Sequence, residues 1–160
     1  MIRHNKQKLV ILGNGMAGAR VAEEILKRGG SELFEITMIG AEPHGNYNRI
    51  LLSNVLNGSQ NADEITMNPL AWYKENGIKL IAGMPAIGIH REKRTVMLLD
   101  ARQVPYDKLI IATGSRPFVP PIPGTDLYGV FVFRTLEDCT SIAKYAQTSK
   151  TAVVIATPVA

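Results

Sequence analysis

The sequence of 160 residues predicts an α/β fold, in which a parallel sheet packs with helices and carries an added antiparallel β-hairpin or meander. Three observations predict it. A strand pattern, a glycine-rich turn, a helical pattern and a second strand pattern follow one another over residues 8–39. Two apolar runs flank the charged tip at residues 91–94, as in a hairpin. A further buried strand pattern, at residues 109–112, returns the chain to the sheet.

The first three elements form a βαβ unit. Residues 8–12 (KLVIL) are a short apolar and β-branched run that ends at Gly13. Residues 16–28 have apolar positions at helical spacing before Gly29, and residues 34–39 (FEITMI) are typical of a buried strand. A right-handed crossover is therefore expected between two parallel strands.

The rest of the chain alternates short elements with long connections. A polar excursion over residues 42–61 contains a short helix at 50–56, and long loops of this kind are usually functional. The other predicted elements are a helix at 69–76, a strand at 78–82, the hairpin of 86–90 with 95–99, an extended proline-rich connector at 117–123, a helix at 136–146 and the start of a strand at 152–156.

Composition narrows the class of protein. The chain is 46% hydrophobic and 20% charged, which are ordinary values for a compact domain. Its net charge of +4 is scattered and aromatic residues make up only 6%, so a general preference for anions fits better than a nucleic-acid groove. Residues 1–7 are expected to be a solvated basic tail. The apolar run at 9–12 is too short for a signal sequence or membrane span, which predicts a cytoplasmic protein without a membrane partner.

The turn after the first strand reads Gly13-Asn14-Gly15-Met16-Ala17-Gly18, which matches G-x-G-x-x-G in its strand–turn–helix context. Gly13 permits a tight turn, Gly15 lets a pyrophosphate approach the backbone, and Gly18 lets the helix pack closely on the strands. The amides and dipole of the helix N-terminus favour the phosphate charge. The competing interpretation is a glycine-rich turn without a ligand.

Glu42 follows the second predicted strand, at the usual place of the ribose-binding carboxylate of such a motif. A carboxylate accepts hydrogen bonds from both ribose hydroxyls and repels a 2′-phosphate. FAD and NAD therefore fit this position and NADP does not. A surface acid without a ligand is the alternative.

These motifs, together with the segment Ala112-Thr113-Gly114-Ser115-Arg116-Pro117, resemble the pyridine nucleotide-disulfide oxidoreductase superfamily. Four segments are similar, more narrowly, to the large subunits of NAD(P)H-nitrite reductases: GNGMAG at 13–18, Glu42-Pro43, YNRILLS at 47–53 and YDKLIIATG at 106–114. The resemblance covers residues 8 to 155. It implies a Rossmann-like FAD-binding domain at residues 8–150 and the start of a truncated NAD(P)H-binding domain at 151–160.

The resemblance implies a set of cofactor-binding residues, and no side chain is assigned a catalytic role because the cofactor carries the redox chemistry. It places the glycine loop at the pyrophosphate, Glu42 at the adenosine ribose, and Leu52 and Ser53 near the flavin. For Arg49, charge-assisted contacts to a pyrophosphate are an independent reason, and a solvated loop arginine is the alternative. The full set is Gly13, Gly15, Met16, Ala17, Gly18, Glu42, Arg49, Leu52, Ser53, Ala86, Thr113, Gly114 and Arg116.

Two departures from the family pattern limit the prediction. Many relatives have a lysine after the Leu-Ser pair, where this chain has Asn54. A second glycine-rich loop is expected after residues 153–155, but the chain continues as Ala156-Thr157-Pro158-Val159-Ala160. NAD(P)H is thus expected to bind only through a domain that these residues lack, and the open sheet edge would allow a homo-oligomer.

Other chemistries are disfavoured. His4, His44 and His90 are far apart in the sequence, which argues against a metal site. Cys139 is the only cysteine and is expected to be a core thiol, so the dithiol chemistry of the disulfide-reductase branch is excluded. The function predicted is an FAD-binding segment of an NAD(P)H-dependent oxidoreductase, whose flavin relays electrons to a downstream acceptor. The alternative is a non-catalytic, truncated dinucleotide-binding module.

Overall fold

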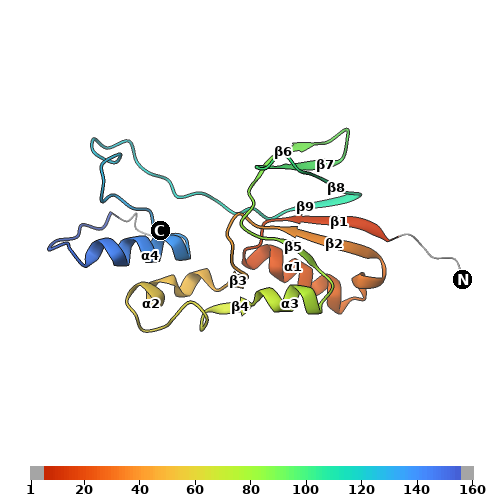
Figure 1. Cartoon of the computed structure of the whole chain (residues 1–160), viewed down its shortest axis with the longest axis horizontal. Coiled ribbons are helices and arrows are strands. Elements are labelled where there is room, and N and C mark those ends of the chain that lie inside the picture. The colour runs from red at the N-terminus through yellow and green to blue at the C-terminus, as the bar shows by residue number, and fades with distance from the viewer. Residues whose placement is uncertain (1–5, 156–160) are drawn as a thin grey trace, which may run out of the picture. The chain divides into compact units, whose positions relative to one another are not determined.

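The computed structural model describes residues 6–155, which divide into two compact units. The first unit comprises residues 6–48 and 63–115, and the second comprises residues 49–62 and 116–155. Figure 1 shows the elements of each unit. The two units are described separately below.

The first unit is built on a parallel sheet of four strands in the order β5-β2-β1-β9. The glycine motif follows β1 (Gln7–Leu12), which lies between β2 (Phe34–Ile39) and β9 (Lys108–Ile111). Strand β5 (Lys79–Ile81) pairs with the other side of β2. The carboxyl ends of the four strands therefore lie at one edge, where ligands bind in open α/β sheets.

Alternating residues of the central strands fill two separate cores, because successive side chains of a strand point to opposite faces. One face packs against α1 (Met16–Lys27) and α3 (Leu70–Glu75), which lie on the same side of the sheet in Figure 1. Its buried members are Leu9, Ile11, Ala22, Ile36, Met38, Tyr73 and Ile78. The other face carries the buried residues Val10, Leu12, Ile39, Val96 and Leu98.

The second core is closed by an antiparallel meander of β6 (Ala86–His90), β7 (Thr95–Leu98) and β8 (Gln103–Pro105). Arg94 and Ala101 have φ of 48° and 67° in the two turns that join these strands. The parallel sheet is thus enclosed between helices and a meander. This confirms the predicted fold class, an α/β domain with a parallel sheet and an added antiparallel element.

Two short strands, β3 (Asn46–Tyr47) and β4 (Thr66–Asn68), were not predicted. They pair antiparallel and draw together the two ends of the polar excursion. Such short strands are recognisable only through their pairing, since two or three residues are too few to show a period. A 3-10 turn, η1 (Gly30–Glu32), joins α1 to β2.

The second unit contains the 3-10 turn η2 (Arg49–Leu51), α2 (Leu52–Leu56) and α4 (Leu136–Ala146). Helix α4 begins at a capping box: the Asp138 amide donates to Thr135 Oγ1 at 3.1 Å, and the Thr135 amide donates to Asp138 Oδ2 at 2.8 Å. Helices α2 and α4 pack on each other through Leu52, Leu136 and Cys139, all buried. The predicted helices at 50–56 and 136–146 are confirmed.

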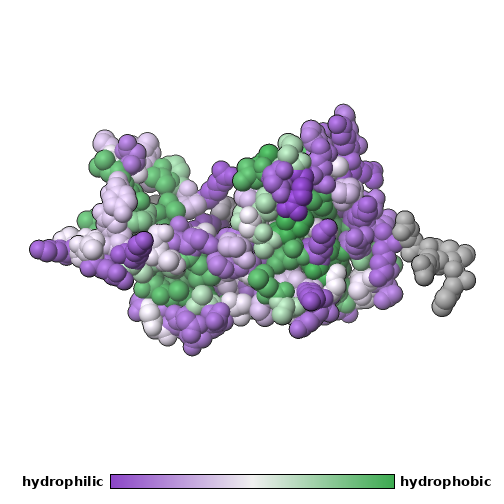
Figure 2. Space-filling model, viewed as in Figure 1, coloured by the Kyte–Doolittle hydropathy of each residue, from purple (hydrophilic) through white to green (hydrophobic). Residues whose placement is uncertain are grey.

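The segment before α4, residues 116–134, includes the proline-rich connector and contains no helix or strand. It leaves many apolar side chains exposed, and Figure 2 shows green surface over this unit. The exposed members are Phe118, Val119, Ile122, Leu127, Tyr128, Val130, Phe131 and Phe133.

The strand predicted to begin at residues 152–156 is wrong over its described part. Residues 152–155 form no strand, and Val153, Val154 and Ile155 are 85%, 87% and 73% exposed. An apolar β-branched run becomes a strand only when its backbone pairs with a neighbour, and no pairing is recorded for these residues. Ala156 and the four residues after it lie outside the described range, as do residues 1–5 of the predicted basic tail.

Candidate functional site

The glycine loop joins β1 to α1 at the carboxyl edge of the parallel sheet. Two of its glycines are required by the protein itself. Gly13 has φ of 114°, and a Cβ there would overlap the carbonyl oxygen of Ala112 after β9. A Cβ on Gly18 would overlap the carbonyl oxygen of Gly13. These two glycines let the helix start directly against the strands.

Gly15 differs from the other two. Its φ and ψ of −83° and −175° are available to any residue, and a Cβ built there has no atom within 4 Å. Neither backbone conformation nor packing therefore explains a glycine at this position. A ligand that approached the backbone closely would require a glycine here.

Helix α1 presents its first turn beside this open space. Gly15 is the N-cap and supplies no side-chain oxygen, so the first amides, including those of Met16 and Ala17, receive no side-chain cap. The first turn contains no acidic residue, and the side chains of Met16 and Ala17 are exposed. Free amides and the positive end of the helix dipole suit an anion here.

Glu42 lies in the loop that follows β2, at the same edge of the sheet. The Tyr47 hydroxyl donates to Glu42 Oε2 at 2.6 Å, and the Gly83 amide after β5 donates to the Glu42 carbonyl at 2.9 Å. Glu42 is half-buried, so its carboxylate is held in place while part of it faces solvent. An oriented carboxylate of this kind can accept hydrogen bonds from the hydroxyls of a sugar.

Three more predicted residues belong to the same unit. Thr113 and Gly114 directly follow β9, and the Thr113 amide nitrogen would be 2.9 Å from a Cβ on Gly13. The β9 strand thus brings them beside the glycine loop, although they are far away in the sequence. Gly114 has φ of 72°, which accounts for glycine there. Ala86 is half-buried at the start of β6, where the register with β7 shifts.

A polar network that the sequence did not predict connects the glycine loop to α3 and to the loop that carries Glu42. Asn14, the second residue of the motif, accepts from the Tyr73 hydroxyl at 2.7 Å and donates to the His44 carbonyl at 3.2 Å. Tyr73 itself is 1% exposed and belongs to the core between the sheet and the helices. No sequence signal identifies this contact, because the partners are joined only through the packing of α3.

The remaining predicted residues lie in the second unit. Arg49, Leu52 and Ser53 line a hollow of about 270 Å³ together with Ile50, Phe133 and Arg134. Arg49 Nη1 donates to the Arg134 carbonyl oxygen at 2.5 Å, which fixes one side of its guanidinium. Arg116 is exposed in the connector. Within its own unit, the structure brings Arg49, Leu52 and Ser53 together.

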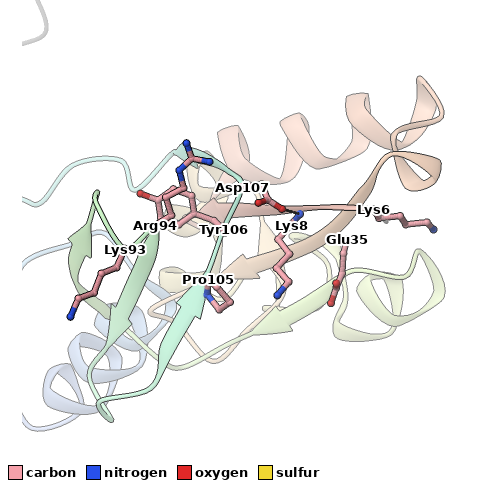
Figure 3. A pocket seen from close by; sticks show the side chains of 8 residues that line it. All are labelled: Lys6, Lys8, Glu35, Lys93, Arg94, Pro105, Tyr106 and Asp107. Atoms are coloured by element: carbon pink, nitrogen blue, oxygen red, sulfur yellow. Dashed lines mark hydrogen bonds between the residues drawn. The ribbon is translucent and has the colours of Figure 1, made fainter. Parts of the chain in front are cut away.

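A larger hollow, of about 450 Å³, lies at the opposite, amino edge of the parallel sheet. Its basic residues are Lys6, Lys8, Lys93 and Arg94, with Glu35 and Asp107 among them. Figure 3 shows that Lys6, Lys93 and Arg94 point in different directions, and the dashed line joins Lys8 to Asp107, whose Oδ2 accepts from the Lys8 amide at 2.7 Å. These cations do not converge on a common point, so the hollow is not built to hold one anion.

Burial also sets the acidity of Cys139. Burial raises the pKa of the thiol, and the neighbouring Asp138 carboxylate raises it further. The thiol donates to the Leu52 carbonyl at 3.6 Å and is 3% exposed. Cys139 is therefore a packed thiol of the α2–α4 contact, as predicted. Over residues 6–155, no three His, Cys, Asp or Glu side chains are grouped as metal ligands, and no helix is long and apolar enough to cross a membrane.

A family model covers both the glycine loop and Glu42. The model for pyridine nucleotide-disulphide oxidoreductases matches residues 7–156, nearly the whole chain. The chain belongs to the pyridine nucleotide-disulphide oxidoreductase family. This confirms the superfamily resemblance noted from the motifs.

Relatives with curated names support the narrower resemblance within this pyridine nucleotide-disulphide oxidoreductase family. The assimilatory nitrate reductase electron transfer subunit of Bacillus subtilis is 50% identical over 150 residues, which are 94% of this chain and 19% of that protein. The nitrite reductase (NADH) large subunit of Escherichia coli is 39% identical over 94% of this chain and 18% of its own length. The chain thus spans about a fifth of the length of these relatives.

Solved structures of the family agree in fold. NADH:rubredoxin oxidoreductase from Clostridium acetobutylicum has a TM-score of 0.78 at 29% identity, covering 89% of this chain and 36% of that one. A ferredoxin reductase from Rhodopseudomonas palustris has a TM-score of 0.79 at 26% identity, covering 89% and 35%. This chain therefore shares its α/β architecture with these oxidoreductases.

Proposed function

We propose that this chain is the FAD-binding portion of an NAD(P)H-dependent oxidoreductase of the nitrite reductase type. The observation that carries the proposal is Gly15, a glycine without a conformational or packing reason, which opens onto empty space beside an uncapped helix N-terminus. A dinucleotide pyrophosphate needs this combination of space and amides. The names of the relatives, which are electron-transfer subunits and reductases, favour a redox dinucleotide.

Each part of the chain would have a defined role in holding FAD. The amides at Gly15, Met16 and Ala17 would bind the pyrophosphate, with Gly13 and Gly18 keeping loop and helix close. Glu42, oriented by Tyr47, would accept from the adenosine ribose hydroxyls. Its charge would disfavour a 2′-phosphate, which supports FAD rather than NADP at this position.

The remaining residues would contact other parts of the nucleotide. Thr113 and Gly114 would approach it from the end of β9, and Ala86 would offer its backbone to the adenine. In the second unit, Arg49 and Arg116 would provide positive charge, with Leu52 and Ser53 placed toward the flavin. The bound flavin would take hydride from a nicotinamide and pass electrons singly to an acceptor. Residues 1–160 contain one glycine fingerprint, so nicotinamide would bind to another domain of the complete protein.

The test is to identify the small molecule held by the purified chain. We expect a yellow protein with flavin absorbance that releases FAD on denaturation, as measured by mass spectrometry. Replacing Gly15 by Val should abolish FAD binding with little change in circular dichroism, because the side chain would occupy the pyrophosphate space. Glu42→Arg should lower FAD affinity, since it removes the ribose acceptor.

Two results would contradict the proposal. A colourless protein that retains ADP or NAD would favour the alternative, a non-catalytic dinucleotide-binding module. A Gly15→Val variant that titrates with FAD like the parent would show that the pyrophosphate lies elsewhere. If Glu42→Arg left the affinity unchanged, Glu42 would be removed from the site.

A further inference from the structure

The polar network behind the glycine loop crosses four segments of the first unit. Asn14 lies in the glycine loop, His44 in the loop that carries Glu42, Asn46 at the start of β3 and Tyr73 in α3. The Asn14 side chain donates to the His44 carbonyl at 3.2 Å and accepts from the Tyr73 hydroxyl at 2.7 Å. The Tyr73 hydroxyl also accepts from the Asn46 amide at 3.1 Å. Asn14 and Tyr73 thus join the glycine loop to the loop that carries Glu42.

The chemistry of the two outer partners fixes the direction of every hydrogen bond. A backbone carbonyl only accepts, so Asn14 must turn its amino group toward His44 and its oxygen toward Tyr73. A backbone amide only donates, so the Tyr73 hydroxyl must receive from Asn46 and give its proton to Asn14. Each group has one orientation that satisfies the network. The arrangement of the two loops is therefore specified, and neither can shift alone without breaking a hydrogen bond that is at least partly buried.

Packing holds both members in place. The Tyr73 ring lies in the core beneath the sheet at 1% exposure, with its centroid 5.0 Å from that of Trp72 in an edge-on contact. On the other side of Asn14, a Cβ on Gly40 would be 2.9 Å from the Asn14 Cβ. Gly40 is thus small enough to admit Asn14, while the tyrosine reaches it from the core.

The network continues away from the loop through buried amides. The Asn46 side chain donates to Asn68 Oδ1 at 2.9 Å, and the Asn68 side chain donates to Glu23 Oε1 at 3.1 Å on α1. Asn46 and Asn68 are 2% and 4% exposed. Helix α1, whose N-terminus faces the proposed pyrophosphate, is thereby connected to the strand pair β3–β4, which follows the loop that carries Glu42.

We propose that Asn14 and Tyr73 are positioning residues for the dinucleotide site: their hydrogen bond holds the glycine loop and the Glu42 loop at the spacing that one nucleotide requires. The inference rests on the proposed function, because it takes the nucleotide to span these two loops. Without the bond the loops would have several arrangements, and FAD would have to select one of them on binding. The apparent Kd for FAD would then equal the intrinsic Kd divided by the fraction of molecules in the competent arrangement.

The test uses Tyr73→Phe, which removes the hydroxyl and keeps the ring, and Asn14→Ala, together with the double variant. We expect each single variant to raise the Kd for FAD about tenfold, in line with the loss of the Asn14–Tyr73 hydrogen bond. The double variant should lose less affinity than the two single losses combined, since both substitutions remove the Asn14–Tyr73 contact. The losses should not coincide fully, because Asn14→Ala also removes the bond to His44 and Tyr73→Phe removes the acceptor of the Asn46 amide. Tyr106→Phe is the matched control, because Tyr106 lies at the amino edge of the sheet, and its Kd should stay within about twofold.

A second measurement separates positioning from general stability. Hydrogen exchange of the ligand-free protein should quicken at the Gly13 amide, which donates to the Ile39 carbonyl at 2.8 Å, and at the Ala19 amide, which donates to Gly15 at 3.0 Å. Exchange in the meander should be unchanged. Gly40→Ala, which crowds Asn14 from the other side, should act in the same direction and serves as the second route if Tyr73→Phe does not fold.

The outcomes distinguish this inference from the proposed function. If the parent binds FAD and the folded Tyr73→Phe and Asn14→Ala variants bind it equally well, the inference is overturned and the proposed function stands. If the parent binds no FAD, the proposed function fails and exchange alone decides the inference. Faster exchange confined to the glycine loop would then support it, whereas uniform or unchanged exchange would overturn it.

Discussion

At the scale of single residues, the three glycines of one motif have different physical causes. Gly13 and Gly18 are required by backbone conformation and by the contact between helix and strand. Gly15 is required by neither, and its open surroundings match a ligand. The sequence pattern treats the three alike. Substitutions should therefore separate a structural class from a binding class.

Gly18→Ala and Gly15→Ala should differ in stability. The new methyl group at position 18 overlaps the Gly13 carbonyl oxygen, so the free energy of unfolding should fall by about 3 kcal/mol. At position 15 the methyl group meets nothing in the protein, and the loss should be below about 1 kcal/mol. Urea denaturation of the ligand-free variants measures both. Equal losses would show that Gly15 is packed after all.

Tyr73 should make stability depend on alkaline pH. Burial, the main cause, raises the pKa of its hydroxyl above the ordinary value of 10.0, and the nearby Glu23 carboxylate adds to this, while the Asn46 amide opposes it. Well below pH 10.0 the folded and unfolded chains both keep the proton, so the contribution is constant. At higher pH the unfolded chain loses its proton first, and stability falls.

Chemical denaturation of the parent and of Tyr73→Phe from pH 8 to about pH 11 tests this behaviour. The other titrating groups are the same in both proteins, so the difference between the two curves reports Tyr73. Tyr73→Phe should lack that part of the decline, so the stability gap between parent and variant should narrow as pH rises. Parallel curves would mean that Tyr73 titrates alike in the folded and unfolded chains.

At the scale of elements, the second unit depends on the contact of α2 with α4. Cys139 is the sole cysteine and lies in this contact, where its thiol donates to the Leu52 carbonyl. A buried thiol with a raised pKa has little reactive thiolate at neutral pH. Modification must therefore wait for the two helices to separate or for the chain to unfold.

Iodoacetamide labelling at pH 8 should accordingly be slower in the folded chain than in urea, by a factor on the order of a hundredfold. Intact-mass spectrometry gives the fraction labelled over time, and Cys139→Ser provides the unlabelled reference. Similar rates in both conditions would show that α2 and α4 separate freely in the native protein.

At the scale of the whole molecule, the parallel sheet of the first unit presents unpaired strand backbone at its edge. Over the described residues, β9 pairs only with β1, and its last residue, Ile111, is 62% exposed. Exposed apolar strand edges favour association with another chain or domain. We expect this edge, and separately the exposed apolar segment before α4 in the second unit, to favour such association.

The 160-residue chain alone should not oxidise NADH faster than free FAD. Hydride transfer depends steeply on the placement of nicotinamide against flavin, and these residues contain one glycine fingerprint rather than two. A steady-state assay with NADH, NADPH and ferricyanide measures the rate, and free FAD at equal concentration is the control. Saturable turnover well above that control would reveal a nicotinamide site within this chain.

The sequence by itself determined the βαβ unit, the glycine motif and the main helices, because these depend on local periodicity and on turn chemistry. Residues 8–12 and 34–39 are apolar runs with β-branched residues and residues 136–146 have a helical pattern, and the structure places β1, β2 and α4 over them. The sequence also predicted that Glu42 follows the second strand, and the structure places it in the loop after β2; its contact with a ribose stays a prediction. These features needed no knowledge of distant contacts.

Only the tertiary structure decided which distant residues meet. Strands β3 and β4 are too short to show a period and exist through mutual pairing, while the apolar run at 152–155 found no partner and formed no strand. The Asn14–Tyr73 hydrogen bond joins residues far apart in the chain and gives no local signal. Likewise, the contrast between Gly15 and its neighbouring glycines depends on the space around each Cα, which packing alone creates.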